Sequence, residues 1–467
     1  MKRFSRQDWL NLILLAAIAW ISRYLLSGGF GLYEDDFTRV PNGIGLSWHG
    51  LGEYWLYMAR VYYANRPLHD LLITSFSMLG WRLHQLTGVY LLGYLLWLLN
   101  IALFYILLWR VAGRSLALAA SLAYVVFSAD TTQAYLTMSL GGQPSITLVL
   151  VAFHAYLSRK AWLSYLLVWP VIMFAYETPF LVFLATPLLP QRETLRDYWK
   201  PFAKNAIILA VLFLSSFLVR FRQTGSGEFN GGYPAAIKLA LLHMLQGPVI
   251  SLGTYVLRPI QTLQQLDWQI LAVILVVLGL GIYLVAQIRV DENLSFRVPG
   301  SGLRLQQRLS MLPPAAQQLV RLLLAGVLML VAAYPITFTT RVWAISGRTT
   351  RGHMAAVPGA ALIIGCLILF FFAWMTAHGW RKLAIFIIAA EVALMAGFGL
   401  TIQRDYVLAW QNQREFWTQI LPLISDASPG DVVLVTPNNL PQTLQIGAVT
   451  WNISRTLDGI LQFPAEL

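Results

Sequence analysis

Long apolar runs, separated by short polar connections, constrain this chain more than any other feature. A run of about 20 apolar residues can cross a bilayer as a helix, because a helix satisfies its own backbone hydrogen bonds. Of the 467 residues, 57% are hydrophobic and 12% are charged, whereas soluble proteins have about 25% charged residues. The sequence therefore predicts an all-α polytopic membrane protein.

Hydropathy and flanking charge divide the chain into eleven predicted membrane spans. The first span lacks a small-residue cleavage site, so we expect an uncleaved anchor rather than a signal peptide. The predicted spans are 9–28, 88–109, 115–129, 143–158, 161–176, 178–190, 206–221, 269–288, 321–338, 356–377 and 383–402.

Basic residues indicate which side of the membrane each connection occupies. Lys2, Arg3 and Arg6 precede the first span, and the segments 191–205 and 289–320 are also basic. The positive-inside rule therefore predicts a cytoplasmic (inner) membrane protein with its N-terminus inside and its C-terminus outside. The rule also accounts for the net charge of +12, since the basic residues are spread through short loops and form no nucleic-acid-binding motif. We expect no nucleic-acid partner.

Residues 1–402 form the predicted transmembrane domain, which includes two long outer loops. In the loop 29–87, apolar residues recur at helical spacing before and after Asn65-Arg66-Pro67, which predicts two amphipathic helices lying flat in the outer headgroup region. The loop 222–268 is rich in glycine, which predicts a mobile segment. Residues 403–467 form a predicted small extracytoplasmic α/β region, with a helix at 406–424 and a strand at 431–436.

Three consecutive carboxylates, Glu34, Asp35 and Asp36, follow the first predicted span. Carboxylates at a lipid boundary are costly unless they face water, a cation or a polar substrate. One of two adjacent carboxylates can act as a general base while the other holds it or binds a cation. The alternative interpretation is a solvated loop or a helix start, where acids favour the helix dipole.

A second polar group, Arg341, Arg348, Arg351 and His353, lies between two late spans on the predicted outer side. This position is unusual, because basic residues are normally concentrated on the cytoplasmic side of a membrane protein. Cations at this surface suit the recognition of a lipid phosphate, although interfacial snorkelling also explains them. Asp130 follows the third predicted span and is either a further outer-side site residue or a helix cap.

The order of these features resembles the C-type (GT-C) glycosyltransferase superfamily, in particular its protein O-mannosyltransferase and aminoarabinose-transferase branch (family 39-like). The resemblance is carried by Asp35-Asp36 and by Asn65-Arg66-Pro67-Leu68 through Leu79-Gly80. It implies a GT-C membrane fold, a catalytic aspartate at Asp35 with Asp36 beside it, and a second outer-side acid at Asp130. The chain departs from the family pattern at Gly352, where an aromatic residue is expected, and at Glu177, near which many relatives have a lysine.

These observations predict an inverting glycosyltransferase that moves a sugar from a polyprenyl-phosphate donor to an acceptor hydroxyl at the outer face. The predicted partners are this lipid-linked sugar, the lipid bilayer, and a glycan, lipid or protein acceptor.

No cofactor is certain, since the carboxylates can hold Mg²⁺ or Mn²⁺ only with substrate oxygens completing the shell. The alternatives are a transporter or flippase of lipid-linked saccharide, and a non-catalytic membrane scaffold. The candidate site residues are Asp35 and Asp36 for catalysis, and Arg66, Asp130, Arg341, Arg348, Arg351 and His353 for substrate or phosphate binding.

Overall fold

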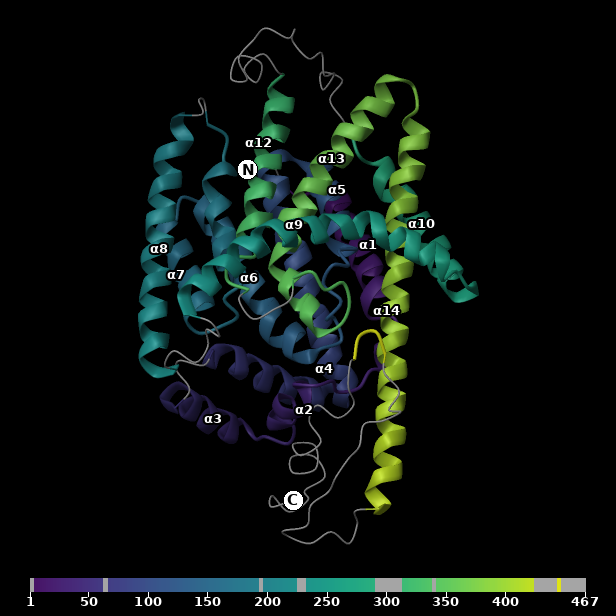
Figure 1. Ribbon diagram of the computed structural model, residues 1–467. Coiled ribbons are helices and arrows are strands. Elements are labelled where there is room, and N and C mark those ends of the chain that lie inside the picture. The colour runs from purple at the N-terminus through teal and green to yellow at the C-terminus, as the bar shows by residue number, and fades with distance from the viewer. Residues whose placement is uncertain are drawn as a thin grey trace.

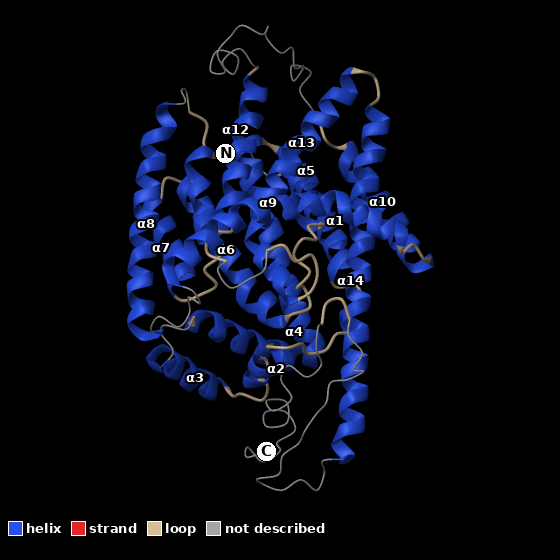
Figure 2. Cartoon of the chain, in the orientation of Figure 1, coloured by secondary structure: helices blue, strands red, loops and turns tan. Residues whose placement is uncertain are grey.

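The structure is a computed structural model that describes residues 4–61, 66–192, 196–224, 232–289, 313–337, 342–423 and 443–446. All regular elements in these ranges are helices (Figure 2). Nine helices of the described residues are long and apolar enough to cross a membrane. The predicted all-α polytopic membrane class is therefore confirmed.

The helices follow one another along the chain with short connections. They are α1 (Arg6–Arg23), η1 (Ser27–Gly29), α2 (Asp36–Arg39), η2 (Pro41–Gly43), α3 (Trp48–Val61), α4 (Pro67–Ala112), α5 (Arg114–Val125), η3 (Thr137–Gly142), α6 (Gln143–Leu157), α7 (Ala161–Met173), η4 (Phe180–Leu188), α8 (Arg196–Thr224), α9 (Gly232–Gln264), α10 (Trp268–Ala286), α12 (Pro314–Ala332), η7 (Arg348–Ala356), α13 (Val357–Ala377) and α14 (Arg381–Leu423).

Most helices stand side by side (Figure 1). Figure 1 shows α2 and α3 at the lower end, whereas the turn between α13 and α14 lies at the upper end. The two ends of the bundle therefore differ. The lower end carries the acidic triplet at the start of α2, and the upper end carries short turns between long helices.

The predicted pair of amphipathic helices is confirmed, with the second joined to the following span. α3 covers the first prediction, and α4 combines the second with the predicted span 88–109. The two parts of α4 meet at a kink, where Gln85 has a left-handed φ of 49°. Gly80 and Gly88 touch across this kink, since a Cβ on Gly88 would overlap the Gly80 carbonyl oxygen. Only glycine fits there, because the two backbones are in direct contact.

Three predicted spans are shorter than expected. The predicted span 178–190 is the nine-residue 3₁₀ helix η4, with Pro187 inside it. The predicted spans 115–129 and 161–176 become α5, of 12 residues, and α7, of 13. A 13-residue α-helix is about 20 Å long, whereas the hydrocarbon core is about 30 Å thick. Hydropathy alone misleads for α5, because all ten residues from Leu116 to Val125 are buried against protein rather than lipid.

Within the predicted outer loop 222–268, residues 232–264 form the helix α9 rather than a loop. This helix is long and apolar enough to cross a membrane, and Figure 1 shows it running across the upright helices. Its polar residues His243 and Arg258 weaken the hydropathy signal, yet both are buried inside the protein. Many of its exposed positions are apolar, among them Leu245 and Val249. The glycine-rich residues 225–231 lie outside the described residues.

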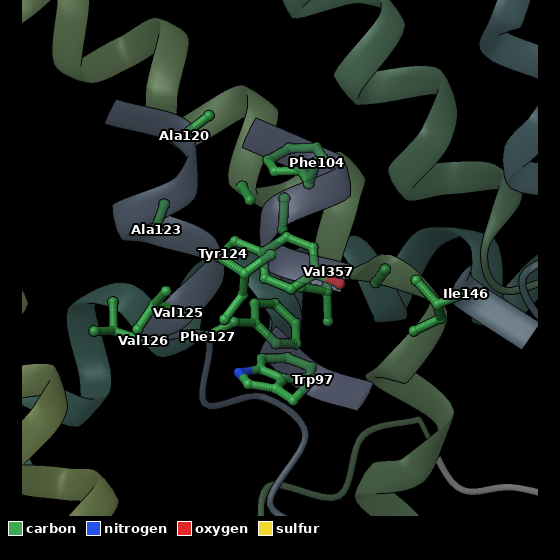
Figure 3. Close-up of a cluster of buried hydrophobic side chains, with 14 of the residues drawn as sticks. Trp97, Phe104, Ala120, Ala123, Tyr124, Val125, Val126, Phe127, Ile146 and Val357 are labelled. Atoms are coloured by element: carbon green, nitrogen blue, oxygen red, sulfur yellow. The ribbon is translucent and has the colours of Figure 1, made fainter. Parts of the chain in front are cut away.

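The core is built where α4, α5 and α13 pack together (Figure 3). Trp97 and Phe104 of α4 contact the ring of Tyr124 in α5, with ring centroids 5.1 and 5.0 Å apart. Close approach of α13 requires Gly365, because a Cβ there would overlap the backbone of Ala120. This packing forms a rigid support beneath the loop that follows α5.

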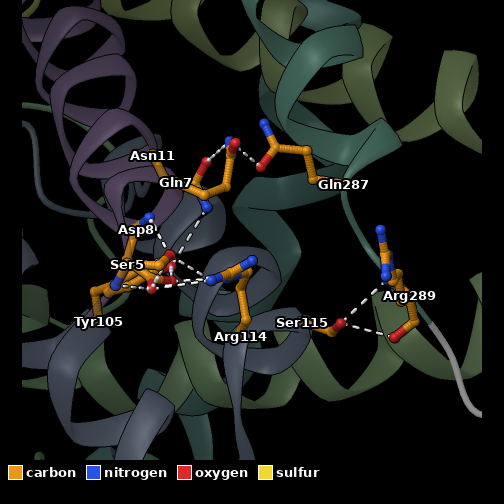
Figure 4. A network of polar contacts seen from close by, with 9 residues as sticks. All are labelled: Ser5, Gln7, Asp8, Asn11, Tyr105, Arg114, Ser115, Gln287 and Arg289. Atoms are coloured by element: carbon orange, nitrogen blue, oxygen red, sulfur yellow. Dashed lines mark hydrogen bonds and ion pairs between the residues drawn. The ribbon is translucent and has the colours of Figure 1, made fainter. Parts of the chain in front are cut away.

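A polar network ties α1, α4 and α5 together (Figure 4), and Figure 1 shows the N-terminus and α5 in the upper part of the bundle, away from α2. Ser5 caps α1 and forms a capping box with Asp8. The Arg114 guanidinium donates to both Asp8 carboxylate oxygens, at 2.7 and 3.0 Å, and Tyr105 donates to one of them at 3.1 Å. Because three residues, Ser5, Tyr105 and Arg114, donate hydrogen bonds to this buried carboxylate, α1, α4 and α5 keep a fixed register.

The C-terminal helix is longer than predicted. The predicted span 383–402 and the predicted helix 406–424 are one helix, α14, which runs through residue 402. The predicted strand 431–436 lies outside the described residues, and so does most of the predicted region 403–467. The division of the chain at residue 402 stays a prediction.

Candidate functional site

Asp36 is completely buried at the start of α2. Its carboxylate accepts hydrogen bonds from the backbone N–H groups of Leu136 and Thr137, at 3.0 and 2.8 Å, and more weakly from Tyr33 at 3.4 Å. Burial raises the pKa of Asp36 to about 7, opposed by the hydrogen bonds from Thr137 and Leu136. Asp36 therefore joins the acidic triplet to the loop 130–137, which is about a hundred residues away in the sequence.

Glu34 and Asp35 share one cation, Arg348. The guanidinium forms an ion pair with Asp35 and lies 3.3 Å from Glu34. The Asp35 side chain is 33% exposed, and that of Glu34 only 9%. Burial raises the pKa of Glu34, and the charge of Arg348 opposes this shift. Asp35 is thus the carboxylate of the triplet that an entering molecule reaches most easily.

The backbone of the triplet is held in a tight turn. Glu34 has a left-handed φ of 47°, which is costly for a residue other than glycine and persists only where neighbours hold it. Two anchors flank it. The Tyr33 hydroxyl donates to the Tyr406 carbonyl of α14 at 2.8 Å, and Asp36 is held as described above. This turn directs Glu34 and Asp35 toward the η7 turn that carries Arg348.

Tyr135 and Gln445 form a second layer behind this pair. The Tyr135 hydroxyl lies 3.1 Å from Glu34 Oε1 and donates to the Gln445 carbonyl at 3.0 Å. Gln445 Oε1 accepts from the Gly347 N–H at 3.0 Å, next to Arg348. Both sides of the carboxylate–guanidinium pair are therefore connected through one residue of the C-terminal tail.

A further group of cations extends from Arg348 along the same surface. Arg351 lies one turn later in η7, and its charge acts on both Glu34 and Tyr176. Its Nε is buried and has no hydrogen-bond partner among the described residues. Arg66 lies over the Tyr176 ring at 5.3 Å and donates to Glu177 through Nε at 2.8 Å. Arg351 and Arg66 thus both act electrostatically on Tyr176.

Asp130 lies in the same loop as Tyr135 but faces a different neighbour. It is buried, accepts from the Thr132 N–H and hydroxyl at 2.9 and 2.6 Å, and is electrostatically coupled to Arg23 at the end of α1. Its neighbour Thr131 contacts the η7 turn through Thr350, with hydroxyl oxygens 3.0 Å apart. Asp130 therefore shapes the loop behind the site, and the structure gives it no direct contact with Glu34, Asp35 or Arg348.

His353 is not brought to the acidic cluster. It is completely buried, and its Nδ1 lies 2.8 Å from the Tyr334 hydroxyl and 3.2 Å from Ser251 of α9. This position fits a core histidine that joins η7 to α9 and α12. Arg341 lies outside the described residues.

Several residues of the site escaped the sequence interpretation. Tyr135 had no signal, since tyrosines are frequent in membrane proteins. Glu177 was noticed as a departure, and the structure pairs it with Arg66. Gln445 lies in a tail whose contact with the site is tertiary. Glu34 was part of the acidic triplet but was not assigned a role.

The described residues hold no group of three or more His, Cys, Asp or Glu side chains arranged to bind a metal ion. In the triplet, both oxygens of Asp36 accept backbone N–H groups, and Arg348 occupies the space between Glu34 and Asp35. We therefore assign no step of the chemistry to Mg²⁺ or Mn²⁺.

Comparison with known proteins found no match by sequence. No protein-family model matches the chain, and no curated protein matches it. Two solved structures, both of ArnT from Cupriavidus metallidurans, are similar to it. The structure bound to undecaprenyl phosphate is 13% identical, with 93% of this chain and 82% of that chain covered and a TM-score of 0.36. The apo structure is 14% identical, with 98% and 85% covered and a TM-score of 0.37. A likeness at this level does not assign the chain to a family.

Proposed function

We propose that this protein is an inverting glycosyltransferase of the C-type superfamily, which transfers a sugar from a polyprenyl-phosphate donor to an acceptor hydroxyl. The single observation that carries the proposal is the ion pair of Asp35 and Glu34 with Arg348 at one end of an apolar helical bundle. It joins a base for a hydroxyl group with a cation for a phosphate. The apolar helices provide a path for a lipid tail.

Asp35 is the proposed general base. Asp36 is unsuited to that role, since it is fully buried and its two oxygens accept backbone N–H groups. Asp35 is partly exposed and pairs with the side chain of Arg348. Asp35 takes the proton of the acceptor hydroxyl, whose oxygen attacks the anomeric carbon on the face opposite the phosphate. One displacement through an oxocarbenium-like state inverts that centre.

The polyprenyl phosphate leaves as an anion and is stabilised by cations rather than by a general acid. Arg348, Arg351 and Arg66 are the proposed phosphate-binding residues. The Nε of Arg351 is buried and has no hydrogen-bond partner in the part of the chain that the structure describes, and a guanidinium suits the bidentate geometry of a phosphate. Stabilisation of developing charge by such groups is commonly the largest catalytic contribution. We place this site at the outer face of the cytoplasmic membrane, with the N-terminus inside.

Asp35→Asn tests the proposal directly. We expect release of polyprenyl phosphate from a synthetic polyprenyl-phosphate-linked hexose or pentose, with envelope fractions as acceptors, to fall by about 10²–10⁴-fold. Glu53→Gln is the matched control, because Glu53 is an exposed acid on α3 and its loss leaves the rate unchanged. Full activity of Asp35→Asn would move the base to another residue. No transfer by the unmodified protein with any donor would overturn the proposed function.

A further inference from the structure

Residues 443–446 of the C-terminal tail dock against the candidate site. They form a tight turn, in which the Thr443 N–H donates to the Ile446 carbonyl at 3.2 Å and the Ile446 N–H donates to the Thr443 hydroxyl at 3.1 Å. Gln445 and Ile446 are buried, whereas Leu444 is 70% exposed. The turn therefore presents Gln445 to the protein and Leu444 to its surroundings.

Gln445 contacts three separate parts of the chain. Its Oε1 accepts from the Thr131 hydroxyl at 2.6 Å and from the Gly347 N–H at 3.0 Å. Its carbonyl accepts from Tyr135 at 3.0 Å, and its N–H donates to Asp405 of α14 at 2.7 Å. Gln445 thus connects the loop that contacts Glu34, the turn that carries Arg348, and the helix that anchors the acidic triplet.

Hydrogen bonds, rather than packing alone, determine where Gln445 lies. On one side it lines a cavity of about 370 Å³ between α9, α10 and α14, whose wall also includes Leu444 and Arg258. A side chain beside a cavity of this size has few packing neighbours there, so lost hydrogen bonds are not replaced by van der Waals contacts. A change in Gln445 should therefore be transmitted to its partners at Gly347 and Tyr135.

We infer that Gln445 is a positioning residue, which fixes the distance between Arg348 and the carboxylates of Glu34 and Asp35. This inference rests on the proposed function, because it assigns Gln445 a role in that reaction. Without Oε1 the Gly347 N–H loses its acceptor, and η7 is joined to Thr131 through Thr350 alone. Arg348, which follows Gly347, then moves relative to Asp35. A misplacement of about 1 Å at a reacting centre can lower the rate about 10²-fold.

Docking of the tail is tested by the accessibility of Ile446→Cys to a maleimide, in the full-length protein in detergent. The native Cys366 is buried and gives a low background. We expect slow labelling of Ile446→Cys in the otherwise unmodified protein. Adding Gln445→Leu should make this labelling at least roughly tenfold faster. Adding Gln445→Glu instead should leave it slow, because glutamate keeps an acceptor oxygen. Leu444→Cys is the exposed control and labels rapidly in every background. If Ile446→Cys is labelled at the same rate in the presence and in the absence of Gln445→Leu, then Gln445 does not hold the tail against the site.

The positioning role is tested by kinetics on the Gln445 variants. We expect Gln445→Leu to lower kcat about 10²-fold while the KM for the acceptor changes less than threefold, and Gln445→Glu to restore most of kcat. Gln411→Ala, at an exposed position of α14, is the control. Faster labelling of Ile446→Cys with unchanged kcat would overturn the positioning role. Absence of transfer by the unmodified protein would instead count against the proposed function, and the labelling comparison would still decide whether Gln445 holds the tail.

Discussion

At the scale of single residues, the adjacent aspartates Asp35 and Asp36 have opposite environments. Asp36 is enclosed and accepts backbone N–H groups from the loop 130–137, whereas Asp35 is partly exposed beside Arg348. The environment of Asp36 suits a structural carboxylate, whereas that of Asp35 suits a carboxylate that can react. Neighbouring carboxylates with different surroundings commonly divide their roles in this way.

The pH dependence of stability should report on Asp36. Its pKa is about 7 in the folded protein and 3.8 as the ordinary value, so its contribution to stability is fully present below about pH 4 and is lost as the pH rises to about 7. We expect the melting temperature of the unmodified protein to include a fall over this window and to lose that contribution in Asp36→Asn. The variant is also less stable by about 1–3 kcal/mol, because its amide nitrogen faces a backbone N–H. Melting curves from pH 4 to 8 check both points, and parallel pH profiles for the two proteins would contradict the first.

At the scale of elements, α4 has two parts with different positions. Its first part lies along the end of the bundle, and its second part runs through the bundle. The kink at His84 and Gln85 separates the two parts, and Gly80 meets Gly88 across it. Since Arg66 precedes the first part of α4, the kink angle decides where this cation lies relative to Tyr176. The position of one predicted phosphate-binding residue therefore depends on two glycines.

Gly88→Ala should destabilise the protein, because the added methyl group overlaps the Gly80 carbonyl and forces the two parts of α4 apart. We expect a loss of about 1–3 kcal/mol, the usual effect of overpacking, measured as a lower melting temperature. Gly52→Ala is the matched control. Gly52 is exposed on α3 with open space around its Cβ position, so alanine there raises helix stability by about 0.5–1 kcal/mol. A neutral Gly88→Ala would show that the two helix parts are not in contact.

At the scale of the whole molecule, the polar network of Ser5, Asp8 and Arg114 (Figure 4) and the candidate site lie at different ends of the bundle, since Figure 1 shows the N-terminus and α5 in the upper part and α2 at the lower end. Long apolar helices separate them. The proposed orientation puts the network at the cytoplasmic side and the site at the outer side. A lipid-linked donor then reaches Arg348 from the outer leaflet.

Labelling of single cysteines tests this orientation. Asn42 and Lys382 are both exposed, the first beside α2 and the second at the start of α14. We expect Asn42→Cys to react with a membrane-impermeant maleimide in intact spheroplasts, and Lys382→Cys to react only after permeabilisation. The buried Cys366 of the unmodified chain provides the blank. The reverse pattern would invert the topology and separate the acidic triplet from any outer-face donor.

The sequence by itself determined the helical membrane class and the two helices of the segment 29–87, and it marked the acidic triplet as a candidate site. Hydropathy, helical periodicity and dense local charge are properties of short segments, so they can be recognised in the sequence without knowledge of tertiary contacts. The α9 helix and the short η4 were not predicted, because burial of Arg258 against protein and of Phe180 in the core depends on neighbouring helices.

Only the tertiary structure decided which carboxylate is buried, and which arginine joins the acidic triplet. Leu136 and Thr137 enclose Asp36 from about a hundred residues away, Arg348 reaches Asp35 across more than three hundred, and Gln445 connects both sides from the tail. No local pattern contains these pairings, because they arise from helices that pack side by side and bring distant loops to the same end of the bundle.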